Sequence, residues 1–210
     1  MTILVLGSTG LVGRALVAQL RATHPNDTLV LPKRNDLAHE LDASIVPDVV
    51  MCCLGTTIKQ AGSEQAFRDV DHHLVIRHAR DMRARGAKHV VVISAVGADA
   101  SSRIFYSRVK GDMEHELATL GYPSVTILRP SLLLGKRTPT RPKEVALEWF
   151  FNALGPLIPN AWRGVHDHQV AHAMIDAMHN PRPGVRVITN AEMVSMPQPM
   201  TSVMGLREEA

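Results

Sequence analysis

The chain has 210 residues, of which 45% are hydrophobic and 20% charged, an ordinary composition for one globular domain with a sizeable core. The net charge of +3 is small and dispersed, and no apolar run could span a bilayer, so we expect neither a nucleic-acid nor a membrane partner. The adjacent Cys52 and Cys53 lie in a predicted strand, which favours packing in a reducing compartment over a metal or redox site. Because no signal peptide is visible, we expect a cytoplasmic protein. We also expect a small-molecule substrate and a monomer or homodimer.

A glycine-rich turn follows the first predicted strand. Thr2–Leu6 is apolar and branched, as in a strand buried on both faces, and the apolar residues after the turn recur at helical spacing. The turn consists of Gly7, Ser8, Thr9, Gly10, Leu11, Val12 and Gly13. Gly7 can supply the tight turn, Gly10 the close approach of a ligand, and Gly13 the packing of helix on strand. Because the N–H groups of a helix N-terminus favour an anion, we expect this turn to hold a pyrophosphate.

A basic loop follows the second predicted strand, Thr28–Leu31. In a dinucleotide fold, an acidic residue at this place selects NAD through the ribose 2′-hydroxyl. This chain has Lys33 and Arg34 instead, and a guanidinium binds a phosphate in a bidentate manner. We therefore expect NADP as the cofactor, with NAD less favoured. The alternative is a solvated basic loop without a ligand.

The next predicted strand is Val49–Leu54, and it ends at small residues that leave room for a cofactor ribose. Glu64–Arg85 predicts a long helix that ends at Gly86. We assign no chemistry to the three histidines on that helix.

Three residues with complementary chemistry follow the β-branched run His89–Ser94, which predicts a central strand. Tyr106 and Lys110 are four residues apart on the predicted helix Arg103–Leu120 and so share one face. An ammonium beside the phenol would lower the pKa of Tyr106, which could then exchange a proton with a carbonyl oxygen. Ser94 would hydrogen-bond the same oxygen. The alternative is a tyrosine packed on the sheet with a lysine extending past it.

The order of these motifs resembles the short-chain dehydrogenase/reductase superfamily, in its atypical branch of NmrA-like and nucleoside-diphosphate-sugar-epimerase-like proteins. The matching segments are GSTGLVG at 7–13, CCLGTT at 52–57, the Ser94, Tyr106 and Lys110 spacing, and RPSLLLG at 129–135. The resemblance extends to about residue 180. It implies a Rossmann-type α/β fold, a doubly wound parallel sheet with helices on both faces and a small C-terminal pocket region. It also implies that Ser94, Tyr106 and Lys110 are catalytic, with Lys110 holding the nicotinamide ribose.

The same resemblance implies further cofactor contacts. Asp36 and Leu37 would mark a stub of the third strand, with Asp36 near the adenine amino group. Contacts along the ribose and the nicotinamide would come from Cys53, Leu54, Gly55, Thr56, Pro130 and Leu132.

We expect one domain over residues 1–194, with a pocket-forming insert at 136–180 and a tail at 195–210. Four of the aromatic residues, Trp149, Phe150, Phe151 and Trp162, fall in the insert and could line a pocket or a subunit contact. A metal site could be drawn from His166, Asp167, His168 and His172. Because the resemblance is to a metal-free superfamily, we expect no metal.

These observations predict an NADP-dependent oxidoreductase that transfers a hydride to or from a small carbonyl or alcohol, with Tyr106 as general acid and base. Two alternatives stay open. One is a redox-sensing regulator that binds a dinucleotide without turnover, although such proteins usually lack the tyrosine. The other is a nucleotide-sugar epimerase or dehydratase, which generally needs more than the 75 residues that follow Gly135.

Overall fold

The computed structural model describes residues 1–33, 35–39, 41–135 and 159–197, and the statements below concern these residues. A six-stranded parallel sheet has the order β2-β1-β3-β4-β5-β8. Its strands are β1 (Thr2–Leu6), β2 (Thr28–Val30), β3 (Val49–Cys52), β4 (His89–Ile93), β5 (Ser124–Arg129) and β8 (Gly184–Thr189). A second, two-stranded sheet pairs β6 (Leu133–Leu134) with β7 (Val165–His166).

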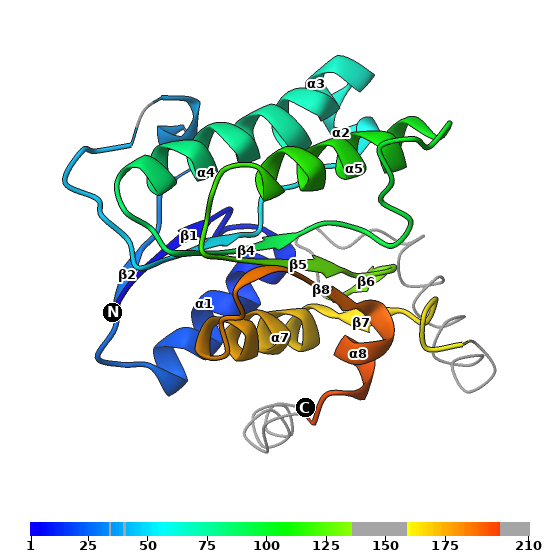
Figure 1. Ribbon diagram of the computed structural model, residues 1–210. Coiled ribbons are helices and arrows are strands. Elements are labelled where there is room, and N and C mark those ends of the chain that lie inside the picture. Colours follow the sequence, from blue (N-terminus) through cyan, green and yellow to red (C-terminus); the bar gives the residue numbers. More distant parts are fainter. Residues whose placement is uncertain (34, 40, 136–158, 198–210) are drawn as a thin grey trace, which may run out of the picture.

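Helices cover both faces of the large sheet (Figure 1). One face carries α1 (Leu11–Thr23), α7 (Asp167–His179) and α8 (Asn190–Ser195). The other face carries α2 (Ile58–Ala61), α3 (Glu64–Arg68), η2 (Asp69–Leu74), α4 (Val75–Ala84) and α5 (Phe105–Ala118). Because side chains alternate along a strand, Ile3 and Val5 join the core under α1 and α7, whereas Leu4 and Leu6 join the core under α4 and α5. The predicted doubly wound α/β fold is therefore confirmed.

The prediction of a third-strand stub at Asp36 and Leu37 is wrong. These residues form a 3₁₀-helix, η1 (Asp36–Ala38), and β2 is the edge strand of the sheet among the described residues. Each crossover between parallel strands takes about a dozen residues. The segment between Val30 and Val49 is long enough for one crossover and too short for a further strand with two.

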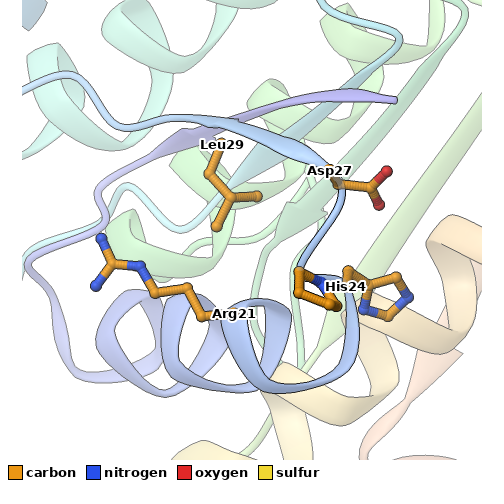
Figure 2. A pocket seen from close by; sticks show the side chains of 5 residues that line it. Arg21, His24, Asp27 and Leu29 are labelled. Carbon is orange, nitrogen blue, oxygen red and sulfur yellow. The ribbon is translucent and has the colours of Figure 1, made fainter.

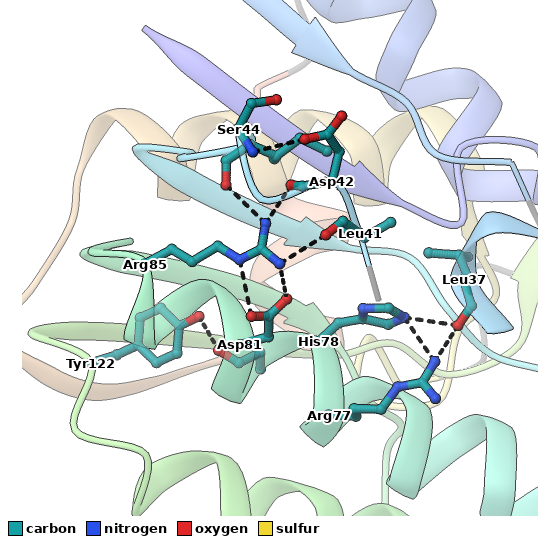
Figure 3. Close-up of polar contacts among 11 residues, drawn as sticks. Leu37, Leu41, Asp42, Ser44, Arg77, His78, Asp81, Arg85 and Tyr122 are labelled. Atoms are coloured by element: carbon teal, nitrogen blue, oxygen red, sulfur yellow. Dashed lines mark hydrogen bonds and ion pairs between the residues drawn. The ribbon is translucent and has the colours of Figure 1, made fainter. Parts of the chain in front are cut away.

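Side chains of α4 hold the irregular segment that replaces this strand (Figure 3). Arg85 donates to the carbonyl oxygens of Leu41, Asp42 and Ile45, and its charge is balanced by Asp81 at 2.8 Å. Nearby, the carbonyl of Leu37 accepts from the helix side chains Arg77 and His78. Backbone carbonyls that would otherwise lack secondary-structure partners are thereby satisfied.

Of the predicted pocket-forming insert 136–180, the structure describes residues 159–180, and none of these lines the cavity at the strand ends. The last part of the insert, α7, packs in the core beside α1, with Val170, Ala173 and Met174 fully buried. Trp162 is 63% exposed, whereas Trp149, Phe150 and Phe151 lie outside the described residues. The predicted tail also lies outside them from residue 198 on. Within the described part of the chain, no helix has the length and apolar character needed to cross a membrane.

Candidate functional site

A cavity of about 860 Å³ lies where the parallel strands end. Its wall includes residues that follow β1, β3, β4 and β5, together with residues of α1, η2 and α5. Ligands of open parallel sheets bind at this carboxyl edge. The position of the cavity therefore makes it the candidate site.

The glycine turn forms one wall of the cavity. Gly7 has a positive φ of +78°, and a Cβ there would lie 2.8 Å from the carbonyl oxygen of Cys53. A Cβ on Gly13 would lie 2.1 Å from the carbonyl oxygen of Gly7, so helix and strand could not pack as they do with any larger residue. Gly10 begins α1 without a side-chain cap, and the first turn contains no acidic residue. This helix N-terminus is therefore suited to an anionic ligand.

Lys110 forms a buried ion pair at the floor of the cavity. Its Nζ lies 2.7 Å from Oδ1 of Asp71, and the two side chains are 5% and 1% exposed. The other carboxylate oxygen, Oδ2, accepts a hydrogen bond of 2.8 Å from the backbone N–H of Thr56. Gly55 leaves the space that the pair needs, since a Cβ there would lie 3.4 Å from Oδ1.

Asp71 is the site residue that sequence reasoning missed. It lies in η2, a π-helical segment that joins α3 to α4 within the predicted long helix. Such segments often occur at functional sites. A signal was present in the sequence: Asp71 is four residues from both Phe67 and Val75, and both of these are buried. A carboxylate at such a position on an apolar face needs a partner.

Tyr106 also lines the cavity, and its ring lies against Phe67 with 5.4 Å between ring centroids. Burial raises the pKa of Tyr106; Lys110 opposes this rise, and Asp71 adds to it. Lys110 thus acts in the expected direction, but the pKa of Tyr106 does not fall below its ordinary value, because burial, with a smaller contribution from Asp71, outweighs the ammonium. Burial acts to lower the pKa of Lys110, but the contact with Asp71 outweighs it, and the ammonium stays charged.

Ser94 follows β4 and completes the group. Its backbone N–H donates to the carbonyl oxygen of Leu128 at 2.7 Å, which extends the pairing of β4 with β5 by one residue. The buried Oγ faces no hydrogen-bond partner within the described part of the chain, although Ser94 lines the cavity. A buried hydroxyl without a partner is costly, so a ligand oxygen in the cavity would satisfy it.

The helix that carries Tyr106 and Lys110 is held by a close loop contact. A Cβ on Gly111 would lie 2.1 Å from the backbone nitrogen of Ala100. The backbone N–H of Asp99 donates to the carbonyl oxygen of Ser107 at 3.0 Å. The loop after Ser94 is thus fixed against α5, and this contact sets the position of both side chains.

Only some of the predicted cofactor contacts lie at the cavity. The predicted contacts that line it are Gly7, Thr9, Gly10, Leu11, Val12, Leu37, Cys53, Leu54, Gly55, Thr56, Lys110 and Leu132. Those outside its lining are Ser8, Gly13, Lys33, Asp36 and Pro130, and Arg34 lies outside the described residues. Asp36 instead accepts the backbone N–H of Lys33 at 2.8 Å and stabilises its own turn. Lining residues that we did not predict include Arg14, Gln60 and Asp71.

The cysteines and the C-terminal histidines show no further chemistry. Burial raises the pKa of Cys52 to about 11, and the Sγ of Cys53 lies 3.7 Å from the Sδ of Met174. His166 and His168 stack on each other at 5.3 Å. Over the ranges that the structure describes, no group of three or more potential ligands could hold a metal ion.

A smaller hollow of about 310 Å³ lies at the C-terminal end of α1, away from the glycine turn (Figure 2). Two of its polar side chains, Asp27 and His24, are engaged in contacts within the chain. Asp27 pairs with the N-terminal amine of Met1 at 2.6 Å, and His24 stacks on His179 of α7 at 4.7 Å. We therefore assign it no ligand.

The parallel sheet, the glycine turn and the cavity at the strand ends define a Rossmann-type α/β domain. Residues 29–154 match the HIM1 family, and the chain belongs to that family.

The chain also resembles known proteins in sequence and solved structures in fold. The chain is 30% identical to Protein HTATIP2 of Rattus norvegicus, over 87% of this chain and 83% of that protein. It is also 30% identical to Protein FMP52, mitochondrial, of Eremothecium gossypii, over 93% and 97% of the two chains. RMD from Pseudomonas aeruginosa complexed with NADPH has a TM-score of 0.63 at 19% identity, over 90% and 78% of the chains. UDP-N-acetylglucosamine 4-epimerase from Bacillus cereus has a TM-score of 0.66 at 19% identity, over 90% and 79%. The two solved structures share the fold.

The expectation of a cytoplasmic protein is wrong. FMP52 relatives from three fungi, Emericella nidulans, Eremothecium gossypii and Candida albicans, are named mitochondrial proteins. We based the expectation on the absence of a visible signal peptide and on the two adjacent free cysteines. Neither observation distinguishes the cytoplasm from a mitochondrial compartment.

Proposed function

We propose that the protein is an NAD(P)-dependent oxidoreductase that acts on a small carbonyl or alcohol. One observation carries the proposal: Ser94, Tyr106 and Lys110 line the same cavity as the glycine turn. A hydroxyl, a phenol and an ammonium beside a nucleotide-type turn are the groups that a carbonyl reduction requires.

The residues of the cavity fit a nicotinamide dinucleotide. Gly7 and Gly13 shape a turn that a Cβ would fill, and the uncapped N-terminus of α1 faces the cavity as a pyrophosphate would require. The complex of RMD with NADPH supports this assignment by fold. Lys33 and the neighbouring Arg34 support NADP over NAD, through the charge of their loop. When bound, the cofactor would supply or accept the hydride.

The chain itself would supply the proton and orient the substrate. Tyr106 donates its phenolic proton to the substrate oxygen, and the Oγ–H of Ser94 donates a hydrogen bond to the same oxygen. Lys110, held by Asp71, would also donate to the ribose of the cofactor. Because the pKa of Tyr106 is raised by burial, the phenol keeps its proton at neutral pH and is ready to donate it.

The test is turnover of NADPH with a panel of small carbonyl compounds, followed by nicotinamide absorbance. Tyr106→Phe removes one hydroxyl and should lower the rate by about two to four orders of magnitude. Tyr122→Phe is the matched control, because its hydroxyl donates to the carbonyl of Ala79 at 2.6 Å and does not line the cavity. A Tyr106→Phe variant that turns over NADPH at the wild-type rate would contradict the role of Tyr106 as proton donor.

A second candidate function is dinucleotide sensing without turnover. The observation that favours it is the engagement of the Lys110 ammonium by Asp71, which weakens the support of a phenolate at Tyr106. A sensor would bind NADPH, show no rate on any carbonyl of the panel, and be indifferent to Tyr106→Phe.

A further inference from the structure

We propose that Asp71 is a positioning residue that holds the Lys110 ammonium in place and offsets its charge at Tyr106, so that Tyr106 ionises at a higher pH than it would beside Lys110 alone. The inference rests on the proposed function of the cavity. It adds to that function a residue that acts on Tyr106 through Lys110.

The geometry fixes the carboxylate on both sides. One oxygen of Asp71 contacts the Lys110 ammonium at 2.7 Å, and the other accepts the Thr56 N–H at 2.8 Å. The Asp71 side chain is 1% exposed, so water screens its charge little. Asp71 therefore holds Lys110 in one position and balances its charge within contact distance.

Three elements bring titratable groups to this cluster: η2 contributes Asp71, α5 contributes Tyr106 and Lys110, and β3 contributes Cys52. Cys52 is uncharged at neutral pH, because burial raises the pKa of its thiol to about 11. The charges facing Tyr106 are therefore one ammonium and one carboxylate.

An unbalanced ammonium would stabilise a phenolate at Tyr106, whereas a neutral pair gives little net stabilisation. Burial further disfavours the phenolate, and the pKa of Tyr106 is raised accordingly. The phenol can donate its proton to a developing alkoxide, whereas only the phenolate can accept a proton from an alcohol. Asp71 thus limits how far the Lys110 ammonium lowers the pKa of Tyr106.

The ionisation of Tyr106 can be measured without any substrate. The chain contains two tyrosines, so Tyr122→Phe leaves Tyr106 as the single source of tyrosinate absorbance. In this background, Asp71→Asn unbalances the ammonium and should move the tyrosinate midpoint to lower pH by about one pH unit. The matched control is Asp69→Asn, which removes the same charge from the same segment but at an exposed carboxylate paired with His73. It should leave the midpoint unchanged.

A second variant keeps the test decisive if Asp71→Asn fails to fold. Asp71→Asn combined with Lys110→Met removes both charges, and its midpoint should not fall below that of the parent. A midpoint that falls in the double variant as far as in Asp71→Asn, or that does not move in a folded Asp71→Asn, would overturn the role of Asp71. Because the titration needs no turnover, it separates this inference from the proposed function: absence of turnover would contradict the latter alone.

Discussion

The buried pair of Asp71 and Lys110 makes a quantitative prediction about stability. Lys110→Met leaves a carboxylate that is 1% exposed and that, among the described residues, keeps the Thr56 N–H as its hydrogen-bond partner. Removing one member of a buried pair costs about 3–5 kcal/mol, a large part of the roughly 5–15 kcal/mol that stabilises a typical domain. At about 2–4 °C per kcal/mol for a chain of this size, the melting temperature should fall by roughly 6–20 °C.

Urea and thermal unfolding of the single and double variants form the assay. Asp71→Asn with Lys110→Met should recover most of the loss, because replacing both charges removes the unpaired one. The ion pair of Arg68 and Asp112 is the control: these side chains are 27% and 29% exposed, so Arg68→Met should cost at most about 1 kcal/mol. A Lys110→Met cost no larger than that of Arg68→Met would refute the reasoning.

Three further predictions concern other parts of the chain. Burial lowers the pKa of His89 to about 4, so its neutral form stabilises the fold above pH 6.5. The unfolding free energy should fall by about 3 kcal/mol as pH drops from 6.5 to 4, and His89→Leu should reduce that slope in denaturation at several pH values. Arg85→Ala removes the donor to three loop carbonyls, so hydrogen exchange should accelerate over residues 41–45, whereas an unchanged rate would contradict the role of Arg85. Lys33→Ala with Arg34→Ala should reduce the preference for NADPH over NADH in calorimetry, and an unchanged preference would identify the loop as solvated surface.

The features that could be predicted from sequence are those whose causes are local. β1 occupies Thr2–Leu6 as predicted, because a branched apolar run ends directly at a glycine turn. Ser94, Tyr106 and Lys110 line one cavity, as predicted. The position of Ser94 follows from the end of a strand, and that of Tyr106 and Lys110 from their four-residue spacing on a helix. Both signals lie within a few residues of the chain.

The features that escaped prediction depend on contacts between distant segments. Asp71 and Lys110 are 39 residues apart, and a π-helical segment rather than a regular α-helix carries Asp71. The missing third strand is replaced by a segment that Arg85 holds from another helix, which local propensity could not reveal. The core position of α7 follows from its packing on α1, and no motif in its own sequence indicates that partner.

The central claim is that the cavity holds a nicotinamide dinucleotide, and calorimetric titration of NADPH tests it most directly. We expect one NADPH per chain for the wild-type protein. Gly10→Ala should lose most of this affinity while staying folded, since its Cβ would lie 3.3 Å from the Gly7 carbonyl oxygen, a tight contact that a small shift relieves, and would occupy the approach of the ligand. Ala18→Ser, which also adds one heavy atom to α1 but on its exposed side, is the control and should bind as the wild type does. Absence of binding by the wild type, or equal binding by Gly10→Ala, would contradict the account.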